Sequence, residues 1–234
     1  VHFLVLGVGL DGKKHILSAA IFWGNELLES WRQALIDLKN RGLTRVLLWV
    51  TDDFSGLTGL LQGLFPTSPH QLCTVHLLRN AQRHLSPEDY IAFKETWREL
   101  SATSSPEAAQ TKFRTLLEKL RPTNKAWVEH LEKRTAHYLV FLSFPASLRS
   151  HVRSTNLPEG LNNQIENLRR NAGGHFHSKR EALIKMKLLT DQLYQTKWRR
   201  SNPRIAANLA RLTNLFRQRF EAELDSNIFL TQNF

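Results

Sequence analysis

The chain has 234 residues, of which 41% are hydrophobic and 23% charged, proportions typical of a soluble globular protein. It carries 32 Lys and Arg against 21 Asp and Glu, and this net charge of +11 predicts a polyanionic partner. One cysteine excludes an intramolecular disulfide, and no apolar run reaches the roughly 18 residues of a membrane helix, so we expect a cytoplasmic protein without a membrane partner.

The positive charge is concentrated in the last third of the chain. Residues 149–234 contain 15 Lys and Arg against 7 Asp and Glu, a net of +8. Residues 1–85 and 86–148 have net charges of only +2 and +1. A phosphate-binding face is therefore expected in residues 149–234.

The first 85 residues alternate between strand and helix patterns. Apolar and β-branched residues predict strands over Val1–Gly9 and His15–Trp23, and Asp11-Gly12 between them is typical of a hairpin turn. The next elements are expected as helix, strand, helix, strand and helix over Asn25–Arg41, Arg45–Val50, Gly56–Leu64, Gln71–Val75 and His76–His84. The run Arg45–Val50 is typical of a strand buried on both faces. This order predicts a mixed α/β sheet.

The rest of the chain has helical patterns. Between Pro87 and about Ser150, turn signals at Ser104-Ser105-Pro106 and Pro122-Thr123-Asn124 divide a segment that we interpret as an all-helical insertion. Three further helices are predicted over Pro158–Asn171, Ser178–Arg199 and Pro203–Glu223.

Asp52 is the first candidate for chemistry. It follows the strand that ends at Val50, and open α/β sheets present functional groups at the carboxyl ends of strands. The alternative is structural, because Asp52 or Asp53 could cap the helix that begins near Gly56. Taken alone, an aspartate before a helix is more often a cap.

Glu159 is the second candidate. It lies in the first turn of a helix, where a lone glutamate is more often a capping or dipole residue. The helix has an apolar face formed by Leu157, Leu161, Ile165 and Leu168. The other side carries Glu159, Asn162, Asn163, Glu166, Arg169 and Arg170. Amides and arginines beside Glu159 favour a polar partner over a face that is only solvated.

Cys73 and His76 form a C-x2-H pair where the last predicted strand passes into a helix. Zinc normally takes four ligands, and the chain has no second cysteine. Adding His70 still gives a weak metal pattern, so structural packing is the favoured interpretation of this pair. Neither a Ser/His/Asp pattern nor a Gly-rich phosphate loop is present.

Four ordered blocks together resemble the Mutator-type transposases, and the resemblance covers nearly the whole chain. The blocks are Val46–Leu57, Gln71–Asn80, Ser154–Asn162 and Gly173–Ser178. The first resembles the family's Asp-Gly-x-x-Gly-Leu, with Asp53 in place of the Gly. A helical region separates the second block from the third, and this order makes the set specific.

The resemblance implies a ribonuclease H-like fold with an Asp-Asp-Glu triad. By motif, the second Asp falls on Asp52 and the Glu on Glu159. Such sites hold two Mg²⁺ or Mn²⁺ ions about 4 Å apart, which serve phosphodiester hydrolysis and strand transfer. The implied partner is double-stranded DNA, as transposon ends and target. We expect Cys73 and His76 to support the site and the following residues to bind DNA: Asn162, Arg169, Arg170, Lys179 and Arg180.

The implied architecture has three parts. A ribonuclease H-like core over residues 1–85 is completed by the helices of 151–234, and residues 86–150 form the helical insertion. The first Asp is expected on a strand upstream, because Asp11 occupies a turn and Asp37 a helix. The fragment alone is therefore expected to be inactive, and the full-length protein to be a homo-oligomer in a bacterial-type cytosol, associated with the nucleoid when bound to DNA.

Two alternatives remain open at this point. The first is a non-catalytic DNA-binding or regulatory protein derived from a transposase, which fits the missing first Asp. The second is an unrelated basic helical RNA-binding scaffold, which accounts for the charge but not for the four blocks.

Overall fold

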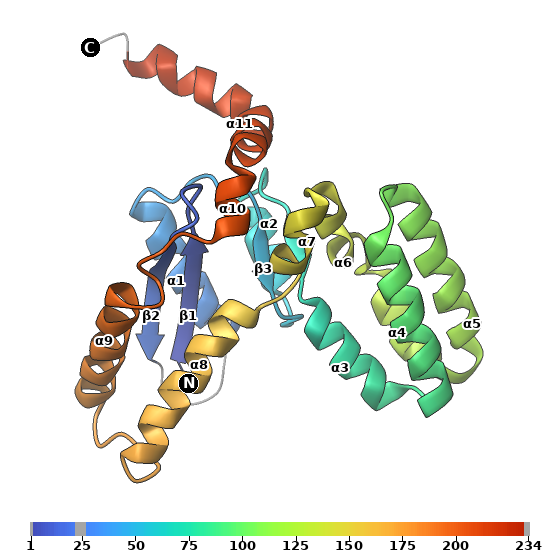
Figure 1. The fold of residues 1–234 in the computed structure, drawn as a ribbon, viewed down its shortest axis with the longest axis horizontal. Helices are drawn as coiled ribbons and strands as arrows, with labels where there is room; N and C mark the ends of the chain where they lie inside the picture. The colour runs from blue at the N-terminus through green and yellow to red at the C-terminus, as the bar shows by residue number, and fades with distance from the viewer. Residues whose placement is uncertain (1, 22–26, 232–234) are drawn as a thin grey trace. The chain divides into compact units, whose positions relative to one another are not determined.

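The computed structural model of the chain describes residues 2–21 and 27–231. They form two compact units, one built from residues 1–45 and 156–234 and the other from residues 46–155 (Figure 1). Each unit is an assembly of helices on a two-stranded sheet. Among the described helices, none is both long and apolar enough to cross a bilayer. The division of the chain at residues 85 and 150 stays a prediction.

The first unit contains the opening hairpin and the C-terminal helices. Its elements are β1 (His2–Val8), β2 (Lys14–Ile21), α1 (Leu28–Asn40), α8 (Asn156–Asn171), α9 (Lys179–Gln195), α10 (Pro203–Ala207) and α11 (Leu209–Thr231). The predicted hairpin is confirmed, because β1 and β2 pair antiparallel. Gly12 adopts φ +76° in the turn, a conformation that glycine adopts without strain. The expected end of the second strand at Trp23 and start of the next helix at Asn25 lie outside the described residues.

Apolar side chains from β1, α8 and α9 form the core of the first unit. Leu161 and Ile165, two residues of the apolar face predicted for α8, are buried against Leu4 of β1 and Met186 of α9. Figure 1 shows α8 lying beside β1. The apolar spacing of α8 therefore directs Glu159 and its neighbours away from this core.

The second unit contains the other two strands and the central helices. Its elements are β3 (Trp49–Thr51), α2 (Leu57–Leu64), β4 (His70–Leu72), α3 (Thr74–His84), α4 (Pro87–Ala102), α5 (Pro106–Glu132), α6 (Thr135–Tyr138), the 3₁₀ helix η1 (Val140–Ser143) and α7 (Ala146–Val152). The expectation of a strand buried on both faces over Arg45–Val50 was wrong. Only Trp49 of that run is buried, because β3 is short and has a single partner strand among the described residues.

Local sequence signals place the ends of the central helices. The Oγ of Ser86 accepts a hydrogen bond from the N–H of Asp89 at 3.1 Å, and the Oγ of Ser105 caps α5 in the same way through Ala108. A proline follows each of these caps at the start of the helix. The turn signal at residues 122–124 appears as a kink inside α5, where Asn124 has φ −136°.

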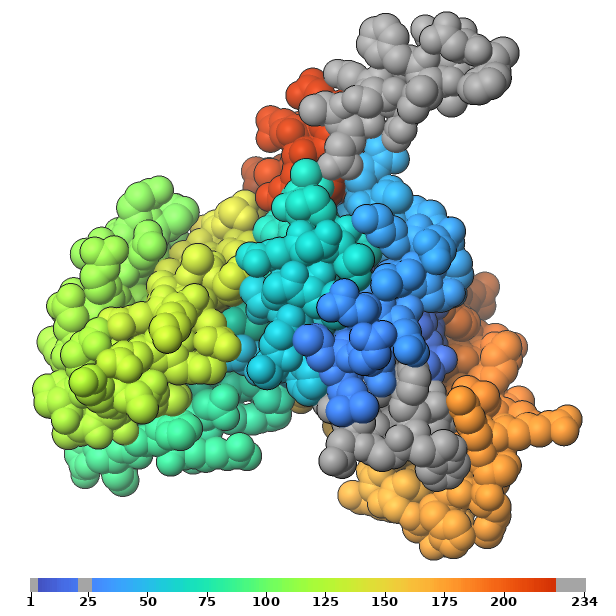
Figure 2. Space-filling view, turned by 180° about the vertical axis from the view of Figure 1, so that it is seen from behind, coloured from blue at the N-terminus to red at the C-terminus, as the bar shows by residue number. Residues whose placement is uncertain are grey.

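Aromatic rings fill the core of the second unit. Phe93 is fully buried on α4, and its ring centroid lies 6.2 Å from Phe113 and 5.6 Å from Trp127 of α5. Trp97, one turn along α4, stacks on Phe93 at 6.5 Å. The side chains of α4 and α5 pack into one continuous mass, drawn in green in Figure 2. Burial of this aromatic surface is the main source of stability of the helical region.

Gln71 fixes strand β4 to the helices that follow α5. Its side chain is fully buried, and Nε2 donates to the carbonyl of Tyr138 at 3.0 Å. Its Oε1 accepts from the N–H of Phe141 at 2.7 Å. Because a buried amide without partners is costly, these bonds hold β4 in one position against α6 and η1.

The described strands form two sheets, although one mixed sheet was expected. β1 pairs with β2, and β3 pairs in parallel with β4, with Trp49 opposite His70 and Thr51 opposite Leu72. The α/β class is confirmed, since each unit combines a two-stranded sheet with helices. The ribonuclease H-like arrangement of a single sheet stays a prediction.

The aromatic core gives a direct test of the fold. Phe93→Ala is expected to lower the free energy of unfolding by about 3–5 kcal/mol, because it removes a buried ring and leaves a cavity. Ile91→Ala on the same helix is the matched control. Ile91 is 58% exposed, so its truncation is expected to change stability by less than about 0.5 kcal/mol. Urea denaturation of the two variants measures the difference, and similar losses would contradict this packing.

Candidate functional site

The carboxyl ends of β3 and β4 bring Asp52 and Cys73 together. Asp52 directly follows β3 and Cys73 directly follows β4, and the two strands are parallel neighbours. The N–H of Cys73 donates to the carbonyl of Thr51 at 2.8 Å, which continues the pairing beyond the last strand residues. Parallel strands end at the same edge of a sheet, so their next residues lie side by side.

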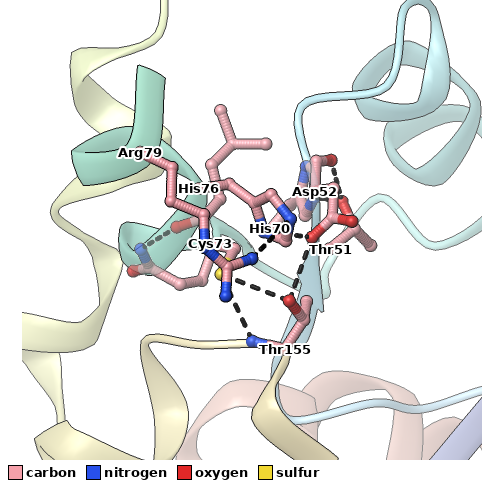
Figure 3. A network of polar contacts seen from close by, with 9 residues as sticks. Thr51, Asp52, His70, Cys73, His76, Arg79 and Thr155 are labelled. Atoms are coloured by element: carbon pink, nitrogen blue, oxygen red, sulfur yellow. Dashed lines mark hydrogen bonds and ion pairs between the residues drawn. The ribbon is translucent and has the colours of Figure 1, made fainter. Parts of the chain in front are cut away.

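His76 completes a group of three potential ligands at this edge (Figure 3). Cys73 is the N-cap of α3, and His76 lies three residues further on the same side of the helix. The His76 Nδ1 is 2.9 Å from Oδ1 of Asp52. The Asp52 side chain is 53% exposed, whereas Cys73 is buried.

Thr155 joins the same group from a segment far away in the sequence. Its Oγ1 lies 3.0 Å from Oδ1 of Asp52 and 3.2 Å from Sγ of Cys73, and its single hydroxyl hydrogen serves one of them at a time. The N–H of Thr155 also donates to Sγ at 3.3 Å. Sequence reasoning missed Thr155, because nothing in the spacing of this residue indicates a contact with Asp52 or Cys73.

Asp53 has a different role from its neighbour Asp52. Its side chain is only 12% exposed, forms an ion pair with Nε of Arg134 at 2.8 Å and is hydrogen-bonded to Nε2 of His130 at 2.7 Å. Burial and the nearby charge of Asp53 raise the pKa of Tyr138 above its usual value. Through these contacts Asp53 connects the loop after β3 to the end of α5 and to the residue that precedes α6.

Neither aspartate caps α2. The N-cap of that helix is Gly56, with φ 81°, and no side chain provides a cap bond there. The structural alternative for Asp52, a helix cap, is thus wrong. Asp52 points instead toward Cys73, His76 and Thr155.

His70 does not join Cys73 and His76 as a third ligand. It is buried, and its Nε2 lies 2.7 Å from Oγ1 of Thr51. Burial, reinforced by the neighbouring His137, lowers the pKa of His70 to about 4. His70 is therefore neutral near pH 7 and is a packing and hydrogen-bonding residue.

Four of the predicted site residues lie on α8, and two of them, Arg169 and Arg170, pair with Glu166. Glu159 lies half-buried in the first turn, and Asn162 is exposed one turn later. Glu166 accepts from Nη2 of Arg169 at 2.6 Å and from Nε of Arg170 at 3.3 Å. Hydrogen bonds from Arg169 lower the pKa of Glu166 to about 2, so this pair stays charged. The guanidinium of Arg169 is thus hydrogen-bonded to Glu166 of the same helix.

Other expected residues fall in separate places. Lys179 and Arg180 are exposed at the start of α9, where Leu183, Ile184 and Leu188 are exposed as well. Their contact with DNA stays a prediction, as does that of Asn162, Arg169 and Arg170. Asp52 belongs to the unit of residues 46–155 and Glu159 to the other unit, so their meeting at one metal site also stays a prediction.

The two aspartates excluded from the triad have local roles. Oδ1 of Asp11 accepts from the N–H of Lys13 at 2.9 Å in the hairpin turn. Asp37 pairs with Arg41 at 3.4 Å on α1. Both contacts are typical of turn and helix-surface residues.

Comparisons with known proteins give a consistent result. The family model described as "Transposase, Mutator family" matches residues 1–201. The chain is 30% identical over 163 residues to a transposase for insertion sequence element IS905 from Lactococcus lactis, and 33% identical over 165 residues to one for ISRM5 from Rhizobium meliloti. These alignments cover 70% and 69% of the chain.

A third relative extends the similarity toward the C-terminus. The transposase for ISRM3 from Rhizobium meliloti is 26% identical over 223 residues, or 93% of the chain. The alignments cover 41%, 40% and 54% of the three relatives, so the chain spans about half of their length or less.

The contrast between the two neighbouring aspartates can be tested by stability. Asp53→Asn is expected to lower the free energy of unfolding by about 2–3 kcal/mol, because it removes the charge that neutralises the partly buried Arg134. Asp52→Asn, the matched control, is expected to cost less than about 1 kcal/mol, since that side chain is largely exposed. Urea denaturation compares them, and an equal or reversed order would show that the roles are assigned wrongly.

Proposed function

Since the chain belongs to the Mutator family of transposases, we propose that it carries part of a transposase catalytic centre, with Asp52 and Glu159 as two of its metal-binding carboxylates. The proposed reaction is metal-dependent cleavage of DNA at transposon ends, followed by joining of the freed 3′-hydroxyls to target DNA. The names of the relatives support a role in transposition.

The exposed carboxylate of Asp52 is the observation that carries this proposal. It lies at the end of a strand, is not a helix cap, and is left accessible while the adjacent Asp53 is used in internal ion pairs. The described contacts of the Asp52 side chain, with His76 and Thr155, both fall on Oδ1. They orient the carboxylate without burying it, as a metal ligand requires.

The chemistry of Asp52 and Glu159 suits a hard divalent cation. Mg²⁺ prefers oxygen ligands and keeps several waters, so a few accessible carboxylates can hold it. Two such ions, when bound, activate the attacking oxygen and stabilise the leaving oxygen of a phosphodiester. Glu159, in the first turn of α8, carries its negative charge at the positive end of the helix dipole.

The proposed fold is ribonuclease H-like, and the first Asp of its triad is proposed on a strand outside this chain. Asp11 lies in the hairpin turn and Asp37 on the surface of α1, so neither is assigned to the triad.

The basic C-terminal third is proposed to bind the DNA backbone. Lys179 and Arg180 are exposed at the start of α9, and the net charge of residues 149–234 is +8. Phosphate contacts of this kind fix the position of DNA without reading its sequence. Arg170, whose side chain is 68% exposed, is the more available of the two arginines on α8.

Loss of either carboxylate tests the catalytic proposal. In the full-length protein, Asp52→Asn or Glu159→Gln is expected to abolish Mg²⁺-dependent strand cleavage while DNA affinity is largely kept, because only a metal ligand is removed. Asp37→Asn is the control, since it removes the same charge from an exposed helix surface, and it is expected to cleave normally. Cleavage retained in both site variants refutes the proposal and favours a non-catalytic DNA-binding or regulatory role.

Salt dependence tests the proposed DNA face. Changing Lys179 and Arg180 together to Ala is expected to reduce the slope of log K against log salt by about 1.8, or about 0.9 for each lost phosphate contact. Changing Lys119 and Lys125 of α5 to Ala removes the same charge elsewhere and is expected to leave the slope unchanged. Binding of the full-length protein to a duplex is the measurement. Equal slopes for both double variants would place the contacts on another face.

A further inference from the structure

Asp52, Cys73 and His76 bring three different ligand types to the ends of β3 and β4. One ligand atom from each residue lies within 4.8 Å of the other two. Carboxylate oxygen, thiolate sulfur and imidazole nitrogen are all ligands of zinc, whereas Mg²⁺ takes oxygen. We propose that these three residues bind a divalent cation of the zinc type, with a fourth position open to water.

The spacing of the three atoms suits such an ion. Donor atoms at about 2.0–2.3 Å from a tetrahedral zinc ion lie roughly 3.5 Å from one another. Oδ1 of Asp52 and Nδ1 of His76 are 2.9 Å apart, and the widest separation in the group stays within 4.8 Å. Side-chain movements of about an ångström therefore suffice, and the strand pairing that fixes Cys73 beside Thr51 is kept.

The surroundings of the three ligands also resemble those of a metal site. The N–H of Thr155 donates to Sγ of Cys73 at 3.3 Å, as outer-shell groups do to a metal-bound thiolate. Nδ1 of His76 faces Asp52, and Nε2 lies on the far side of the ring, 3.5 Å from Nη1 of Arg79. Since Nε2 carries the ring proton when Nδ1 holds a cation, Arg79 has to move away from Nε2 on binding. Cys73 is buried while Asp52 is exposed, so a cation would enter from the Asp52 side.

A three-residue site explains why the sequence pattern was weak. The C-x2-H pair has no third ligand nearby in the sequence, because His70 is buried and bound to Thr51. The third ligand is Asp52, which is 21 positions before Cys73 and reaches it through the parallel strand pair. This inference does not rest on the proposed function. A zinc-type ion would take Oδ1 of Asp52, which faces His76, and would leave Oδ2 for the magnesium site proposed above.

Cobalt(II) is the probe, because it occupies zinc sites and its absorption reports the ligands. The chain has a single cysteine, so a thiolate-to-cobalt charge-transfer band can arise only from Cys73. Titrating the purified chain with Co²⁺ is expected to give this band, with visible bands of a four-coordinate ion, saturating at one ion per chain. Zn²⁺ is expected to abolish the bands by displacement, and binding is expected to release the thiol proton.

Two variants show whether Asp52 and His76 bind the ion together with Cys73. Asp52→Asn and His76→Gln are each expected to weaken cobalt binding by more than about tenfold, since even outer-shell losses cost that much. Glu159→Gln is the matched control. It should abolish cleavage under the proposed function but leave the cobalt band unchanged, which separates failure of one proposal from failure of the other. Far-ultraviolet circular dichroism confirms that each variant is folded.

A second control concerns adventitious histidine binding. The rings of His175 and His177 lie 4.8 Å apart in an exposed loop, where they could hold cobalt without a thiolate. Changing both to Ala is expected to leave the charge-transfer band intact. The proposal is overturned if wild-type chain gives no such band. It is equally overturned if the band survives in both Asp52→Asn and His76→Gln, or is lost in Glu159→Gln.

Discussion

The parallel pairing of β3 with β4 is the constraint on which the candidate site depends. Because both strands end at the same edge, the residues that follow them, Asp52 and Cys73, become neighbours despite their separation in the sequence. The fully buried Gln71 anchors β4 to α6 and η1, so the aromatic helical core supports this edge. The position of this edge is thus set by backbone pairing and by a buried amide.

The two adjacent aspartates differ in role, because Asp53 is structural and Asp52 belongs to the candidate site. Asp53 turns inward, pairs with Arg134 and contacts His130, which holds the loop after β3 in place. Asp52 turns outward and keeps a solvated carboxylate, which costs little and leaves it available to a cation. Both aspartates directly follow β3, so the end of this strand supplies one structural and one accessible carboxylate.

Local signals predicted much of the fold. The Asp11-Gly12 turn, the turn signal at Ser104-Ser105-Pro106 and the apolar face of α8 all depend on neighbours within a few residues, and the structure confirms them. The long buried strand over residues 45–50 was wrong, because strand length and burial depend on partners from elsewhere in the chain. The resemblance to Mutator-type transposases rested on ordered motifs and agrees with the family match.

The sequence by itself determined the family, the α/β class, the concentration of positive charge and the identity of Asp52, Cys73 and His76 as candidates. Only the tertiary structure decided that Asp52 is no helix cap and that His70 is buried against Thr51. It also decided that Thr155 contacts both Asp52 and Cys73. The reason is physical. A motif records which chemical groups are present along the chain, whereas hydrogen bonding and burial depend on distances across strands and helices that spacing does not encode.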